Sequence, residues 1–178
     1  MAFRKLFRRV RANTRKDFSY EPLRSEPPQI RVIRIKPGED DEVIECELKH
    51  QPLDETHTCL SYTWGDPANP KQFLVNGKRM TARSNLWAFL QTARRYKFTE
   101  WIWIDAICIN QDDTDEKNSQ VPLMGAIYRR AHFVVVWLGI SDEEAIALAR
   151  LDGLFRGYFN TTQARACAAS LAEHLHEQ

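Results

Sequence analysis

The sequence predicts an α/β fold with a central, mainly parallel sheet and added antiparallel hairpins. Three short apolar runs, within residues 58–66, 101–105 and 133–139, each end at glycine or at polar residues. The segments between them have the spacing of helices, and strands that alternate with helices predict parallel pairing through right-handed crossovers. Residues 101–104 show no polar alternation, which is typical of a strand covered on both faces.

Size and composition fit one globular domain. The chain has 178 residues, of which 43% are hydrophobic, and domains usually hold about 100 to 200 residues. No run approaches the roughly 18 apolar residues of a membrane span, and no secretory signal core is present. We therefore expect a cytoplasmic protein. Its four cysteines lack a Cys-x-x-Cys spacing, which favours reduced core thiols over disulfides or a zinc site.

The N-terminus is strongly basic. Residues 1–16 hold seven Lys and Arg and no acid, while the whole chain has a net charge of +1. We predict that residues 1–28 form a solvated, disordered arm and a proline-containing linker. Contact of residues 3–16 with an anionic membrane and a role as a transit peptide are the alternatives. The acidic body and the lack of a zinc-finger or RNA-binding motif argue against nucleic acid as a partner.

Two hairpins are predicted from alternating residues around turns. Residues 30–35 and 43–48 alternate on either side of a turn that contains Pro37-Gly38. Residues 72–76 lead into Asn76-Gly77, a strong type I′ turn signal.

Helices are predicted after the second hairpin. Ser84 is the expected N-cap of the first, whose apolar residues recur at helical spacing up to Arg94-Arg95. The second is expected from Ser119 to Arg130, with Val121, Met124, Ile127 and Tyr128 facing inward. Residues 141–144 (SDEE) form a capping box that predicts the start of a third helix, and residues 159–178 include an Ala-rich C-terminal helix.

The polar residues after the apolar run 101–104 are the best candidate site. Ligands of open α/β sheets bind outside the carboxyl ends of the strands, where Asp105 falls. The competing interpretation is a strand that ends in a polar turn. Cys108 has no histidine near it in sequence, so a buried structural thiol is favoured over a nucleophile. Trp64 is interpreted as a core residue or as a wall of the crevice.

Several common catalytic motifs are absent from the sequence. It contains no Gly-x-Gly, no Gly-Lys-Ser/Thr, no Gly-x-Ser-x-Gly and no His-Glu-x-x-His. Residues 112–116 (DDTDE) lack the central glycine and the spaced glutamate of a calcium loop, which favours an acidic loop leading into a helix. We expect neither a bound metal nor a required cofactor.

The motifs together resemble the heterokaryon incompatibility (HET) domain of filamentous fungi, over roughly residues 20–140. The resemblance rests on residues 60–66 (LSYTWGD), 75–77 (VNG), 85–86 (NL), 103–111 (WIDAICINQ), Asp113, Glu116, 120–121 (QV), Met124, 127–128 (IY), Ala131 and 136–139 (VWLG). It implies a HET domain over residues 29–158 and a role in non-self recognition and regulated cell death. Its motif residues imply a ligand-binding or structural set: Tyr62, Trp64, Gly65, Asp66, Cys108, Asn110, Gln111, Asp113, Gln120 and Tyr128.

HET domains are also distantly similar to TIR domains, which implies a flavodoxin/TIR-like, three-layer fold. Some TIR domains assemble into oligomers, and some cleave NAD with a glutamate on the helix after the third strand. The resemblance thus implies two mechanisms. In one, the domain associates with itself or with another incompatibility or death-signalling protein. In the other, NAD is the substrate and a carboxylate from Asp105, Glu116 or Glu144 stabilises an oxocarbenium-like centre.

Overall fold

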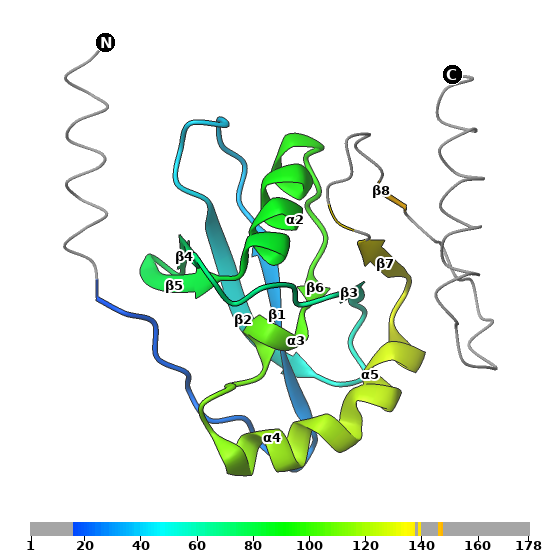
Figure 1. The fold of residues 1–178 in the computed structure, drawn as a ribbon. Helices are drawn as coiled ribbons and strands as arrows, with labels where there is room; N and C mark the ends of the chain where they lie inside the picture. The colour runs from blue at the N-terminus through cyan, green and yellow to red at the C-terminus, as the bar shows by residue number, and fades with distance from the viewer. Residues whose placement is uncertain (1–15, 138, 140–145, 148–178) are drawn as a thin grey trace, which may run out of the picture.

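The computed structural model describes residues 16–137, 139 and 146–147 (Figure 1). They form a mixed sheet in the order β5-β4-β2-β1-β6-β3-β7-β8 with helices packed against it. The hairpin β4–β5 lies at one side of Figure 1, and β7 and β8 lie at the other. The elements are β1 Gln29–Ile35, β2 Glu45–Pro52, β3 Thr58–Tyr62, β4 Lys71–Val75, β5 Lys78–Ala82, α2 Ser84–Arg95, β6 Ile102–Trp103, α3 Asp105–Cys108, α4 Thr114–Gln120, the 3-10 turn η1 Val121–Leu123, α5 Met124–Arg130, β7 Val134–Trp137 and β8 Ile146–Ala147.

The three predicted parallel strands are neighbours in the order β6, β3, β7. Cys59 of β3 pairs in parallel with Trp103 of β6 on one side and with Val134 of β7 on the other. The α/β class and this parallel core are therefore confirmed. The sheet as a whole is mixed rather than mainly parallel, because β1 runs antiparallel to both β2 and β6. The first hairpin thus joins the sheet directly beside the parallel core.

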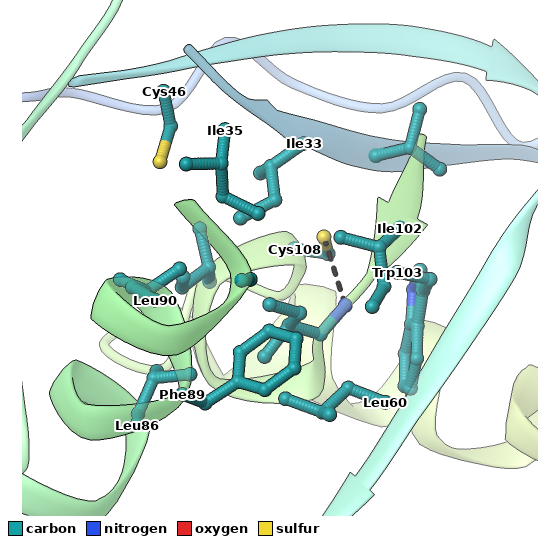
Figure 2. Packing of buried hydrophobic residues seen from close by; sticks show 14 of the residues in the cluster. Ile33, Ile35, Cys46, Leu60, Leu86, Phe89, Leu90, Ile102, Trp103 and Cys108 are labelled. Atoms are coloured by element: carbon teal, nitrogen blue, oxygen red, sulfur yellow. Dashed lines mark hydrogen bonds between the residues drawn. The ribbon is translucent and has the colours of Figure 1, made fainter. Parts of the chain in front are cut away.

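Helices cover both faces of the parallel core. The apolar side of α2 packs on one face, where Leu86, Phe89 and Leu90 point toward β1 and β3 residues (Figure 2). On the opposite face, the ring of Tyr128 in α5 makes an edge contact with Trp103, at a centroid distance of 5.7 Å. Within the described part of the chain, no helix is long and apolar enough to cross a membrane.

The second hairpin is built as predicted. Strands β4 and β5 pair antiparallel, with Val75 opposite Lys78. Asn76 and Gly77 have φ values of 49° and 76°, the left-handed region that a type I′ turn requires at both central positions. The Asn76 side chain also donates to Leu48 O and accepts from Leu48 N, both at 2.9 Å, and so ties the turn to β2.

The ends of two predicted helices differ from the structure. Ser84 is the first helical residue and Arg83 takes the N-cap position, without a side-chain cap. The second helix begins at Thr114 instead of Ser119, because Asp113 caps it by accepting a hydrogen bond from Glu116 N at 3.0 Å. The helix then tightens into the 3-10 turn η1 at Val121-Pro122.

The tightening at η1 changes which residues face inward. Val121 is 52% exposed instead of buried, whereas Ile127 is buried as predicted. Farther along the chain, Ile146–Ala147 pair antiparallel with β7, so the helix predicted to begin at Ser141 is wrong at these two residues. The capping box at residues 141–144 and the Ala-rich segment 159–178 lie outside the described residues.

The chain before β1 makes specific contacts with the sheet edge. Phe18 N donates to Arg79 O at 2.8 Å, and Arg79 N donates to Lys16 O at 2.9 Å. Farther on, the Tyr20 hydroxyl donates to Ile107 O at 2.9 Å. Residues 16–20 therefore run from the edge strand β5 to the α3 segment.

Candidate functional site

A pocket of about 270 Å³ lies outside the carboxyl ends of β3 and β6. This is the region where open α/β sheets bind ligands. Its walls come from the end of β3 and the following loop, from β5 and the start of α2, and from α3 and the loop after it. The lining residues are Tyr62, Trp64, Pro67, Pro70, Thr81, Ala82, Arg83, Leu86, Ala106 and Gln111.

Asp105 lies behind this pocket and fixes one of its walls. Its Oδ2 accepts a hydrogen bond from Trp64 Nε1 at 2.9 Å, and its Oδ1 accepts from Ala106 N at 2.7 Å. The Asp105 carbonyl accepts from Gln111 Nε2 at 2.9 Å. Burial raises the pKa of the Asp105 carboxyl, and the hydrogen bonds from Trp64 and Ala106 oppose that rise. In this arrangement Asp105 orients Trp64 and Gln111, which line the pocket.

Tyr62 and Arg83 complete the polar part of the pocket wall. The Arg83 guanidinium lies over the Trp64 ring at 5.1 Å and donates to Gly65 O at 2.9 Å. Burial raises the pKa of the Tyr62 hydroxyl, and the charge of Asp105 raises it further, while the charge of Arg83 lowers it. Tyr62 therefore keeps its proton at neutral pH and remains a hydrogen-bond donor.

Glu116 is held in a buried ion pair. Arg31, which is 0% exposed, donates from Nη1 to Glu116 Oε1 at 2.5 Å and from Nη2 to Oε2 at 2.9 Å. Asn110 N also donates to Oε1 at 2.6 Å. Burial alone would raise the pKa of Glu116, but the hydrogen bonds from Arg31 and Asn110 outweigh it and the pKa is lowered. Both carboxylate oxygens are thus used to hold the loop before α4.

Arg31 is the centre of this network, and the sequence interpretation did not single it out. It also donates to Cys108 O at 3.0 Å and to Glu21 O at 2.6 Å, and it stacks over the Tyr20 ring at 4.8 Å. It therefore joins the segment before β1, strand β1, α3 and α4. The available signal was a charged residue inside an apolar strand, because a buried charge requires a partner.

Cys108 lies in the core below the site. Its thiol is 1% exposed and its Sγ accepts a hydrogen bond from Ile104 N at 3.3 Å (Figure 2). Burial raises the pKa of this thiol to about 12. Because only the thiolate is a good nucleophile, the environment suits a packed core thiol.

Asn85 joins the ends of two parallel strands. Its Nδ2 donates to Thr63 O at 2.5 Å, and its Oδ1 accepts from Trp137 Nε1 at 2.8 Å. A Cβ added to Gly65, whose φ is +70°, would lie 3.3 Å from Asn85 Cβ. Glycine at position 65 therefore permits both the left-handed turn after β3 and the close approach of α2.

The remaining motif residues hold loops and helix ends. Asp66 Oδ1 accepts from Ala68 N at 2.8 Å, and the Asn110 side chain accepts from Asp112 N at 3.3 Å. The buried Gln120 donates to Gln29 O at 3.4 Å, and the Tyr128 hydroxyl donates to Leu60 O at 2.9 Å. Glu144 lies outside the described residues. Among those that are described, no three His, Cys, Asp or Glu side chains are grouped so that they could hold a metal ion.

Comparison with known proteins places these motifs in one family. Residues 57–171 match the model of the family described as heterokaryon incompatibility protein (HET). The chain is 34% identical, over 148 residues, to heterokaryon incompatibility protein 6, OR allele, of Neurospora crassa. That alignment covers 72% of this chain and 22% of the Neurospora protein, so the chain spans about a fifth of that relative. No solved structure matches. The family match, over more than half of the chain, shows that this protein belongs to the heterokaryon incompatibility (HET) family.

Proposed function

We propose that this chain is an effector domain of fungal non-self recognition and regulated cell death, which acts in the cytoplasm through self-association. The exposed position of Val121 carries this proposal. Val121 is one of the residues on which the family resemblance rests, and it follows the buried Gln120 directly. The next residue, Pro122, is exposed as well, so η1 presents two adjacent apolar side chains to solvent. Contiguous exposed apolar surface marks contacts with other molecules.

The roles of the motif carboxylates also support a binding function. Glu116 is paired with Arg31, and Asp105 holds the Trp64 indole and the first turn of α3. Both carboxylates therefore have structural roles that order the loops around the pocket. Another incompatibility or death-signalling protein is the alternative partner of the same surface.

Val121→Asp is expected to reduce self-association without unfolding the domain. A charge at the centre of a contact must lose its hydration there, whereas at an exposed site it is tolerated. Val43→Asp is the matched control, because Val43 is 46% exposed and lies outside the motifs. Molar mass measured by light scattering over a range of concentrations tests this. A wild type that stays monomeric at every concentration would refute self-association and direct attention to a different partner protein.

We also propose a distant flavodoxin/TIR relation for the parallel core. Numbered along the chain, β3, β6 and β7 are its first, second and third strands, and their spatial order is second, first, third. The flavodoxin-like fold begins with the same order. The antiparallel β1–β2 hairpin beside β6 is an addition to that pattern.

The second candidate function is cleavage of NAD at the glycosidic bond, which the position of Asp105 favours. Its carboxylate does not line the pocket, but it binds Trp64 and Ala106, which do. Movement of the Trp64 indole would bring the carboxylate into contact with a ligand in the pocket. In this reaction Asp105 would stabilise positive charge on the ribosyl carbon while the bond to nicotinamide breaks, and water would then add to that carbon.

Under this second function, Asp105→Asn is expected to reduce nicotinamide release by roughly 100-fold or more, because asparagine carries no charge to stabilise the ribosyl cation. Asp54→Asn, on the exposed turn between β2 and β3, is the control and should release nicotinamide at the wild-type rate. Release is followed chromatographically with NAD and the purified chain. Equal rates in both variants would remove Asp105 from the reaction, and no release by the wild type at any protein concentration would exclude this function.

A further inference from the structure

The pocket at the ends of β3 and β6 has one aromatic and apolar side. Trp64 and Tyr62 contribute rings, and Pro67, Pro70 and Leu86 contribute apolar surface. The Trp64 ring is held in one orientation, because its Nε1 donates to Asp105 and Arg83 lies over it. A fixed aromatic wall next to apolar surface favours a flat ring as the bound group.

The charged lining of the pocket is positive. Arg83 is the cation, and none of the described residues that line the pocket is acidic. The Arg83 Nη1 donates to Gly65 O, but a guanidinium carries five N–H donors in all. The Asp105 oxygens accept hydrogen bonds from Trp64 and Ala106, behind the wall.

The start of α2 adds to this positive character. Of the pocket wall, Ala82 and Arg83 precede its first turn and Leu86 belongs to it. This turn has neither an acidic residue nor a side-chain cap. The N-terminal end of a helix carries a partial positive charge that favours anions. Arg83 and the N-terminal end of α2 therefore both favour an anion in the pocket.

The size of the pocket limits what it can hold. Its volume of about 270 Å³ lies just below the range of roughly 300–1,000 Å³ that holds drug-sized ligands. One ring with one charged substituent matches this space better than an extended molecule does. We propose that this pocket binds a small aromatic anion, with its ring against Trp64 and Tyr62 and its anionic group on Arg83.

Three probes measure separately what the ring and the anionic group of the proposed ligand contribute to binding. Phenyl phosphate carries both the ring and the anion, phenol carries the ring alone, and inorganic phosphate carries the charge alone. Calorimetry on the full chain is expected to show that phenyl phosphate binds about tenfold or more tightly than either fragment, since a charge-assisted hydrogen bond adds to the stacking. Equal binding of phenyl phosphate and phenol, or no binding of phenyl phosphate, would overturn the proposal.

Two variants of Arg83 test the anion contact. Arg83→Gln is expected to weaken phenyl phosphate about tenfold more than it weakens phenol, and Arg83→Lys, which keeps the charge, should lose less. Arg130→Gln is the control, because Arg130 is an exposed arginine at the end of α5. If Arg83→Gln weakened phenol as much as phenyl phosphate, or if Arg130→Gln had the same effect as Arg83→Gln, Arg83 would not be the anion contact. Thermal unfolding of each variant confirms that it is folded.

Binding of phenyl phosphate and self-association of the chain are tested independently of each other. Val121 belongs to η1 and does not line this pocket. A chain that binds phenyl phosphate but remains monomeric would support the ligand site and refute the proposed assembly. A chain that assembles through Val121 without binding phenyl phosphate would support the proposed assembly and refute the ligand site.

Discussion

Glu116→Gln is expected to lower the free energy of unfolding by about 3 kcal/mol. The reason is that Arg31 is 0% exposed and its charge would lose the carboxylate that compensates it. Removal of one partner from a buried ion pair leaves an uncompensated charge, which costs about 3–5 kcal/mol. Glutamine keeps one acceptor oxygen for Arg31 or Asn110 N, so we expect the lower end of that range. Urea unfolding of both proteins, with a common slope, measures the difference.

The surface pair Arg34–Glu47 supplies the control. Its two side chains are 42% and 37% exposed, and Glu47→Gln is expected to cost less than about 1 kcal/mol, because exposed ion pairs contribute little. A cost for Glu116→Gln as small as that for Glu47→Gln would contradict the structural role of the Arg31–Glu116 pair.

The pH dependence of stability gives a second check on this pair. Because the pKa of Glu116 is lowered in the folded protein, its contribution is complete above the ordinary glutamate pKa of 4.5 and is lost as the pH falls through the lower, folded-state value. The stability difference between the wild type and Glu116→Gln should therefore shrink as the pH falls below 4.5. A difference that stays constant would mean that the carboxylate charge is not its source.

The part of the fold that could be predicted from sequence depends on local pattern. Apolar runs identified β3, β6 and β7, and Asn76-Gly77 identified a hairpin because only certain residues adopt its turn. The pairing of β1 with β6 joins segments about 70 residues apart and left no local trace. The early start of α4 was missed because Asp113, read as part of an acidic loop, serves as its N-cap.

The residues of the candidate site also fall into those that local sequence pattern identified and those that it did not. Trp64, Asp105 and Gln111 were identified because each follows a predicted strand, and strand ends gather at one edge of a parallel sheet. Arg31 and Arg83 were not, because each acts on groups that are distant in sequence. Arg31 contacts Glu116, 85 residues away, and Arg83 contacts Trp64 across the β4–β5 hairpin. The position of a residue in the sequence shows which strand it follows. It does not show which long side chain from a distant part of the chain contacts that residue.

Asn85→Ala is expected to lower the free energy of unfolding by about 2 kcal/mol, because it leaves two partners without their hydrogen bonds. The Trp137 indole, in a residue that is 3% exposed, loses the acceptor of its Nε1–H, and Thr63 O loses its donor. A buried polar group left unsatisfied costs about 1–3 kcal/mol. Chemical denaturation measures the loss.

The same substitution is also expected to weaken the pocket, since Asn85 holds Thr63 next to Trp64. Binding of phenyl phosphate should fall in Asn85→Ala even at temperatures where the variant is fully folded. Asn118→Ala, on the exposed side of α4, is the control and should change stability by no more than about 0.5 kcal/mol. If Asn85→Ala lost stability but bound the probe as the wild type does, Asn85 would join the strand ends without ordering the pocket. Loss of both stability and binding would show that the hydrogen bonds of Asn85, which join β3, β7 and α2, also keep Trp64 in place.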